Sequence, residues 1–188
     1  MRVLGISGSL RRGSHNTRLL RAAGELLPPP ARLEVFDGLK DVPPYDEDDD
    51  GERAPVAARR LRKAIHDADA VLIATPEYNS SIPGQLKNAL DWASRPATRS
   101  VFLGIPVAVI GASTGMFGAV WSQAETRMVL GSMGARVIDR DLPVAKANDA
   151  FTDDGRLADL ELHERLEETL AELVAEAEQS AAASAMAA

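Results

Sequence analysis

A chain of 188 residues with 45% hydrophobic and 26% charged residues has the length and composition of one globular domain. Its formal net charge of −7, from 21 basic and 28 acidic side chains, argues against a protein that binds nucleic acid through its phosphate backbone. The absence of cysteine excludes disulfides, thiolate metal sites and cysteine nucleophiles.

No apolar stretch approaches the roughly 18 residues that a membrane span needs, and the N-terminal apolar run is too short for a secretory signal. We therefore expect a cytoplasmic protein without a membrane span. The histidines His15, His66 and His163 lie far apart without metal-ligand spacing. We interpret them as ordinary surface or helix residues and expect no metal site.

The chain begins with an apolar segment, residues 2–6, that predicts a buried strand, followed by a loop of small residues over 7–16. Apolar residues then recur from 19 to 26 at the i, i+3, i+4, i+7 spacing of a helix face, and the prolines at 28–30 end that helix. A second strand is expected at 32–36.

Residues 38–53 fit neither a helix nor a strand, and they contain the acidic run from Asp46 to Asp50. We expect a solvated loop there, with contact to a cation or a partner as the alternative. A second helix over 55–67 and a third strand over 70–74 follow from the apolar pattern.

The third helix is expected to begin at Pro83, since the fixed φ of proline suits the first position of a helix. In it, Lys87 and Asp91 are interpreted as a surface ion pair, and Trp92 as a side chain that seals the base of the helix. A fourth strand over 106–110 then leads into a turn of small residues and a fourth helix that ends near residue 130.

A short fifth strand at 136–138 and a last helix from about residue 157 complete the pattern. Alternating strands and helices predict a parallel sheet covered on both faces, because parallel neighbours need crossover helices. We predict a three-layer, flavodoxin-like, doubly wound α/β fold with five parallel strands in the order 2-1-3-4-5. It forms a single domain over residues 1–178, and residues 179–188 are expected to be a frayed tail.

Three loops with unusual chemistry follow the first, third and fourth strands, at the sheet edge where ligands of open parallel sheets bind. The first is rich in hydroxyls, carries Arg11 and ends at a helix N-terminus, so it predicts a phosphate-binding loop. It matches neither G-x-x-x-x-G-K-[ST] nor G-x-G-x-x-G, which argues against a nucleoside triphosphate. The alternative is that Ser14 or Asn16 merely caps the helix.

In the second loop, Pro76 holds the chain extended, which is expected to leave the backbone groups of residues 77–80 free to bind the edge of a ligand. Tyr78 and Asn79 add an aromatic face and a two-way amide, so a planar heteroaromatic ring fits here. A plain connector in which Tyr78 packs locally is the alternative. The third loop, residues 111–115, either binds the other edge of the ring or forms a simple tight turn.

Two motifs, GSLRRGSHN at 8–16 and TPEYNSSIPGQLKNALDW at 75–92, resemble the NAD(P)H-dependent FMN reductases, a family of quinone, chromate and azo-dye reductases. The resemblance implies bound FMN that is reduced by NADPH or NADH and reoxidised by a quinone, azo dye, chromate or flavin in ping-pong fashion. By motif position it assigns the FMN phosphate to Ser9, Arg11, Ser14 and Asn16, the isoalloxazine ring to Pro76, Glu77, Tyr78 and Asn79, and a third flavin loop to Ser113 and Gly115.

No catalytic residue is predicted, because hydride transfer between nicotinamide and flavin needs position and electrostatics from the protein but no acid or base. Glu77, beside the ring, has either a chemical role or a role as a hydrogen-bonding loop residue. Trp121 stands where relatives often have arginine. If that arginine serves oligomer contacts or the nicotinamide phosphate, the assembly or the NADPH preference of this protein is left open, and a core role for Trp121 is the alternative. The resemblance also implies a homodimer or homotetramer, with the third or fourth helix at the contact.

Two other classes of function remain for comparison. A flavodoxin-type electron carrier would depend on a partner protein, and its usual T-x-T-G-x-T phosphate loop is absent. A binding or regulatory module that has lost the flavin is disfavoured by the nearly complete phosphate and ring loops.

Overall fold

A parallel sheet in the strand order β2-β1-β3-β4-β5 forms the centre of the computed structural model, which describes residues 1–96 and 100–187. Its strands are β1 (Arg2–Ser7), β2 (Arg32–Val35), β3 (Ala70–Thr75), β4 (Pro106–Ala112) and β5 (Arg136–Val137). The predicted fold class and strand order are confirmed. A sixth short strand, β6 (Pro143–Val144), which the sequence analysis does not predict, pairs in parallel with the carboxyl end of β4.

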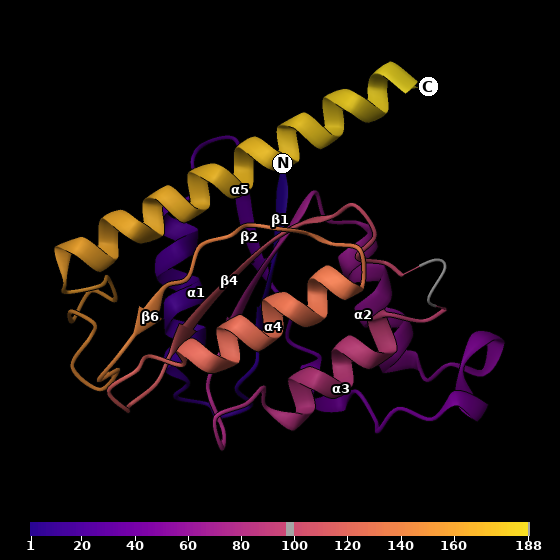
Figure 1. Ribbon diagram of the computed structural model, residues 1–188, viewed down its shortest axis with the longest axis horizontal. Coiled ribbons are helices and arrows are strands. Elements are labelled where there is room, and N and C mark those ends of the chain that lie inside the picture. The colour runs from indigo at the N-terminus through magenta and orange to yellow at the C-terminus, as the bar shows by residue number, and fades with distance from the viewer. Residues whose placement is uncertain (97–99, 188) are drawn as a thin grey trace.

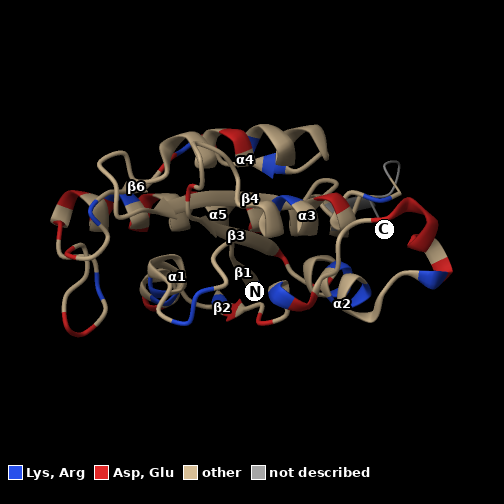
Figure 2. Cartoon of the chain, turned by 90° about the horizontal axis from the view of Figure 1, so that it is seen from below, with Lys and Arg blue, Asp and Glu red and all other residues tan. Residues whose placement is uncertain are grey.

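Helices cover both faces of the sheet: α1 (His15–Leu26), α2 (Val56–His66), α3 (Gly84–Ala93), α4 (Val120–Ser132) and α5 (Leu160–Ala187). Apolar side chains of α1 and α5 form one buried cluster with the sheet, and those of α2, α3 and α4 form a second. Figure 2 shows charged residues on the helices and outer loops, while β3 and β4 carry none. This is the three-layer arrangement that the alternating pattern predicts.

The last helix differs from its prediction at both ends. It starts at Leu160 because the carboxylate of Asp159 accepts hydrogen bonds from the N–H groups of Glu161 (2.9 Å) and Leu162 (3.1 Å) and so caps the first turn. It continues through Ala187, so residues 179–187 are helical where the sequence analysis expects a frayed tail. Alanine, the strongest helix former, dominates this stretch, which projects beyond the rest of the molecule (Figure 1).

The acidic run is held by contacts within its own segment. Asp46 and Asp50 cap short 3₁₀ turns, and Asp50 also pairs with Arg62 of α2 at 2.8 Å. Burial of Asp50 favours its neutral form, but hydrogen bonds from Arg62 and Gly51 outweigh burial and lower its pKa below the ordinary value. Asp50 therefore ties the end of this segment to α2, while Asp46 to Asp49 are exposed, as expected for a solvated loop.

The third helix carries the predicted local contacts. Lys87 and Asp91 form an ion pair at 2.6 Å, one turn apart on its surface. Trp92 is buried, and its indole N–H donates a hydrogen bond to the carbonyl of Pro43 at 2.8 Å. Among the residues described, no helix is both long and apolar enough to cross a membrane.

The strands end together at the carboxyl edge of the sheet. In register, Ser7 of β1 lies opposite Ala74, and Thr75 of β3 lies opposite Gly111 of β4. The loops that leave these three strands therefore start side by side, as a ligand site at this edge requires.

Candidate functional site

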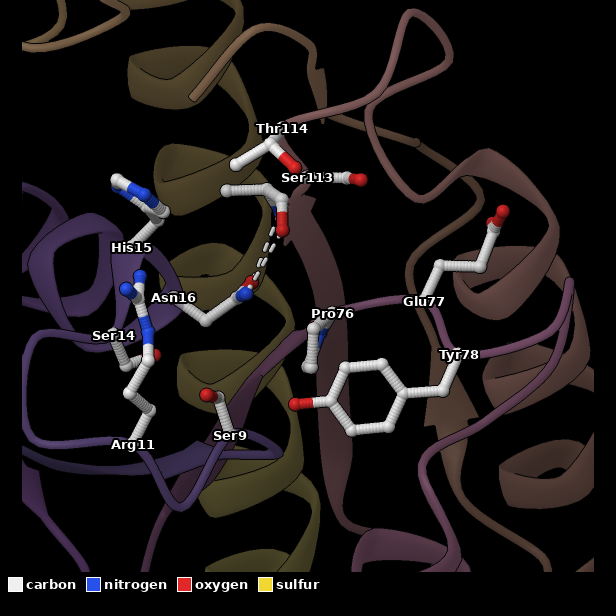
Figure 3. A pocket seen from close by; sticks show the side chains of 11 residues that line it. Ser9, Arg11, Ser14, His15, Asn16, Pro76, Glu77, Tyr78, Ser113 and Thr114 are labelled. Carbon is white, nitrogen blue, oxygen red and sulfur yellow. Dashed lines mark hydrogen bonds between the residues drawn. The ribbon is translucent and has the colours of Figure 1, made fainter. Parts of the chain in front are cut away.

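A cavity of about 230 Å³ opens at the carboxyl edge between the loops after β1, β3 and β4. Its lining is drawn in Figure 3 and consists of Ser9, Arg11, Ser14, His15 and Asn16 from the first loop, Pro76, Glu77 and Tyr78 from the second, and Ala112, Ser113 and Thr114 from the third. The structure thus brings the three predicted loops together around one site.

Two predicted site residues, Asn79 and Gly115, do not line this cavity. Asn79 and Ser80 have φ values of 53° and 59° and form the tip of a two-residue turn. Across it, the backbone groups of Tyr78 and Ser81 bond to each other in both directions at 3.2 Å, as in a type I′ hairpin. The expectation that all backbone groups of residues 77–80 are free is therefore wrong for Tyr78.

The first loop is folded around the start of α1. Ser14 caps this helix, since its hydroxyl accepts a hydrogen bond from the N–H of Thr17 at 3.2 Å. The N–H of Ser14 donates to the carbonyl of Arg11 at 3.1 Å, which closes the loop into a turn. Capping and cavity lining, which the sequence analysis treats as alternatives for Ser14, are both observed.

Asn16 joins the first loop to the third. Its amide nitrogen donates to the carbonyl of Ala112 and its amide oxygen accepts from the N–H of the same residue, both at 2.9 Å (Figure 3). The side chain is almost completely buried. Asn16 therefore fixes the distance between α1 and the end of β4, in addition to lining the cavity.

Glu77 holds the start of α4. Its carboxylate accepts hydrogen bonds from the N–H groups of Trp121 (3.1 Å) and Ser122 (3.2 Å). The N-cap residue of α4, Ala119, has a left-handed backbone and no side-chain cap, so the negative charge of Glu77 takes that role. In Figure 3 the carboxylate points away from Tyr78. These contacts favour the role of a hydrogen-bonding loop residue.

A second carboxylate makes the reverse contact, from α4 to the second loop. Glu125 accepts hydrogen bonds from the hydroxyl of Ser81 at 2.7 Å and from the N–H of Ile82 at 3.1 Å. The hydroxyls of Thr75 and Ser122 add a buried contact at 2.9 Å. The hairpin that carries Tyr78 is thus held on α4. In each of these contacts one partner, Glu125 or Ser122, lies outside the two quoted motifs.

The third loop is held by β6 and α4. The N–H of Ser113 donates to the carbonyl of Val144 at 3.0 Å. Gly118 has a φ of 57°, and a Cβ atom there would lie 2.3 Å from the carbonyl carbon of Pro143, so only glycine fits. The buried side chain of Gln123 bonds both to the Gly118 carbonyl (3.0 Å) and to the N–H of Leu142 (2.9 Å).

Sequence reasoning missed three lining residues, His15, Ala112 and Thr114. His15 lies inside the first motif, directly before Asn16, and this position could have indicated that it lines the cavity. Trp121 has no core role, since its side chain is 47% exposed and packs edge-on against Phe117, with ring centroids 4.9 Å apart.

The lining residues fit a phosphate-bearing, ring-containing group. In Figure 3, Arg11, Ser14 and His15 lie on one side of the cavity and Pro76 and Tyr78 on the other. The first side combines a cation and hydroxyls with the N-terminus of α1, which favours an anion. The first and second loops approach each other closely at Gly8 and Pro76, since a Cβ atom on Gly8 would lie 3.2 Å from Pro76 Cδ.

The family profile described as NADPH-dependent FMN reductase matches residues 1–149. The chain belongs to this family. It is 42% identical over 171 residues to an NAD(P)H-dependent FMN reductase of Pseudomonas aeruginosa, and this match covers 90% of the chain and 91% of the relative. It is 37% identical over 155 residues to a quinone reductase of Pseudomonas putida, covering 82% and 83% of the two chains.

Solved structures agree with the family assignment. The flavoenzyme NAD(P)H:(acceptor) oxidoreductase FerB from Paracoccus denitrificans is 34% identical and superposes with a TM-score of 0.82, covering 95% of this chain and 98% of that one. As a member of the FMN reductase family, the protein is an oxidoreductase whose cofactors are FMN and a nicotinamide nucleotide.

Proposed function

We propose that the protein transfers reducing equivalents from NADPH or NADH to a quinone through FMN held at the carboxyl edge of the sheet, in a ping-pong sequence. The observation that carries this proposal is the convergence of three loops on one cavity, with a cationic, hydroxyl-rich side opposite an aromatic hairpin. The quinone is proposed as acceptor on the likeness to quinone reductases. Azo dyes, chromate and free flavin are further acceptors to be compared.

In this proposal Ser9, Arg11 and Ser14 bind the FMN phosphate, and Asn16 keeps the third loop in place beside them. The cavity of about 230 Å³ is smaller than the roughly 300 to 1,000 Å³ of complete ligand pockets. The phosphate end of FMN therefore fills it, and the isoalloxazine ring lies at its open rim beside Pro76 and Tyr78. A ring at the rim has one accessible face, which the nicotinamide and the acceptor must use in turn.

Bound FMN supplies the acceptance and donation of hydride, and the protein supplies position and electrostatics. Glu77, the carboxylate nearest the proposed ring position, is occupied with the N-terminus of α4. We therefore assign it to positioning the hairpin and propose no catalytic acid or base.

We further propose that the protein is a homodimer or homotetramer with α4 at the contact. Trp121 and Met128 lie seven residues apart on α4 and Phe117 lies in the turn before it, and the side chains of Phe117, Trp121 and Met128 are 59%, 47% and 68% exposed. A row of large exposed apolar side chains marks an interaction surface. The proposed compartment is the cytoplasm, where NADPH and NADH are available.

The test is spectroscopic and kinetic. The purified protein, supplied with FMN and desalted, is expected to keep a visible flavin absorption band and to oxidise NADPH or NADH in the presence of a quinone. A colourless protein that oxidises neither nucleotide would overturn the proposal. Flavin retention without direct nicotinamide oxidation would instead indicate an electron carrier, and a panel of quinones, azo dyes, chromate and flavin would identify the preferred acceptor.

A further inference from the structure

His15 lines the cavity, yet its side chain takes part in neither the cap of α1 nor the bridge made by Asn16. Its ring stacks on Phe151 with the two planes 9° apart and the ring centroids 6.3 Å apart. The guanidinium carbon of Arg18 lies 4.6 Å from the centroid of the same phenyl ring. The imidazole is thus held between the cavity and a segment that follows β6.

The charged groups that act on His15 are both cations, Arg11 from the first loop and Arg18 from α1, while the segment after β6 contributes the uncharged Asn148 and Phe151. Burial lowers the pKa of His15 below its ordinary 6.5, and Arg11 and Arg18 lower it further, against a smaller opposing effect of Asn148. Its Nδ1 atom is buried without a hydrogen bond of normal geometry from the residues described. Burial and the two cations therefore favour the neutral form of the ring.

We propose that His15 is a further phosphate-binding residue of this cavity and that it takes up a proton from solvent when the phosphate of FMN binds. This inference rests on the proposed function. Burial and the charge of Arg11 both disfavour the protonated imidazole; a phosphate dianion beside Arg11 offsets that charge and favours protonation, and a protonated imidazole donates from both nitrogens. One of these donors then forms a charge-assisted hydrogen bond to the phosphate.

The consequence is that FMN retention depends on pH, because His15 is protonated to a greater extent in the bound state than in the free protein. Relative to a variant without His15, FMN binding tightens as the pH falls from 8 to 6, by about three- to sixfold if the pKa of His15 rises by about one. Riboflavin lacks the phosphate, so its binding stays independent of His15. The phosphate also titrates, with a pKa near 6, but this contribution is the same in a variant without His15.

The first experiment follows the imidazole signals of the full chain by NMR over pH 5 to 9, with and without saturating FMN. The chain has three histidines, so His15→Phe assigns the signal of interest by its loss. The titration midpoint of His15 is expected to rise by about one pH unit with FMN. His66, whose side chain is 79% exposed on α2, provides the control signal, which is expected not to respond to FMN.

The second experiment measures FMN and riboflavin binding by calorimetry at pH 6 and 8, in buffers of different ionisation enthalpy. Wild type and the control His66→Phe are expected to take up more protons with FMN than His15→Phe, which keeps an aromatic ring against Phe151. Equal proton uptake in all three proteins, or an unchanged His15 midpoint, would overturn the inference while FMN still binds. Failure of wild type to bind FMN would overturn the proposed function as well.

If His15→Phe does not fold, His66→Phe and His163→Phe assign the remaining signal of the folded protein by elimination. The NMR midpoint of His15 with and without FMN then decides between the two outcomes.

Discussion

Arg11 and Arg12 are adjacent, exposed and equally charged, but only Arg11 lines the cavity. A cation that touches the phosphate directly contributes a charge-assisted hydrogen bond, whereas its neighbour adds only a screened long-range attraction. Substitutions of Arg11 and Arg12 therefore separate the effect of direct contact with the phosphate from the effect of positive charge near the cavity.

We expect Arg11→Ala to weaken FMN binding by about 1 to 3 kcal/mol and to leave the stability of the apoprotein nearly unchanged, because the side chain is exposed. FMN titration followed by fluorescence quenching measures the first, and urea unfolding measures the second. Arg12→Ala is the matched control. Equal losses in both variants would place the phosphate elsewhere.

Asn16 acts on the fold as well as on the cavity, since both ends of its amide bond to the backbone of Ala112. We expect Asn16→Ala to lower the free energy of unfolding by about 2 to 4 kcal/mol, as two buried backbone groups lose their partners. FMN binding should also weaken by about 1 to 3 kcal/mol, because the third loop is no longer fixed.

Urea unfolding of the apoprotein and FMN titration check the two effects separately. Asn16→Asp is the informative second variant, since its carboxylate still accepts from the N–H of Ala112 but cannot donate to the carbonyl. An apoprotein of unchanged stability in Asn16→Ala would contradict the bridging role.

At the scale of elements, the second loop and α4 hold each other through two carboxylates. Glu77 from the loop caps α4, and Glu125 from α4 binds Ser81 and Ile82 of the loop. The hairpin that carries Tyr78 therefore takes its position from a helix that begins more than 40 residues further along the chain.

We expect Glu77→Gln to lower stability by about 0.5 to 1 kcal/mol, because the amide keeps the hydrogen-bond acceptor but loses the charge at the helix N-terminus. Turnover of NADPH with a quinone should fall only slightly, since the residue is given no chemical role. Thermal unfolding and steady-state kinetics measure the two. A loss of turnover by several orders of magnitude, with normal FMN content, would show that Glu77 acts in the reaction.

At the scale of the whole molecule, the exposed row on α4 is the proposed contact between copies. Trp121→Glu places a charge in the middle of this row, and we expect it to shift the protein toward the monomer. Light scattering after size exclusion measures the mass, and Lys87→Glu, on the surface of the neighbouring α3, is the charge control. A wild-type protein that is already monomeric at micromolar concentration would refute the proposed contact.

The strand order and the three-loop site followed from the sequence, because apolar runs and helix periodicity are local properties and parallel strands bring their loops to one edge. The two motifs likewise named seven of the residues that line the cavity, and the third loop added Ser113. Apolar periodicity says little about the tail, a stretch in which alanine alone favours a helix, so its helical conformation was not visible in the pattern and its fraying stays a prediction.

Contacts between segments far apart in sequence were decided only by the tertiary structure. The bridge from Asn16 to Ala112 spans 96 residues, and no local pattern reveals that the two ends of the side-chain amide meet the N–H and C=O of a single residue. The stacking of His15 on Phe151 likewise depends on the path taken after β6. The sequence alone determined which types of side chain lie in the loops at this edge of the sheet. Packing decided which of those side chains face the cavity and which hold its loops together.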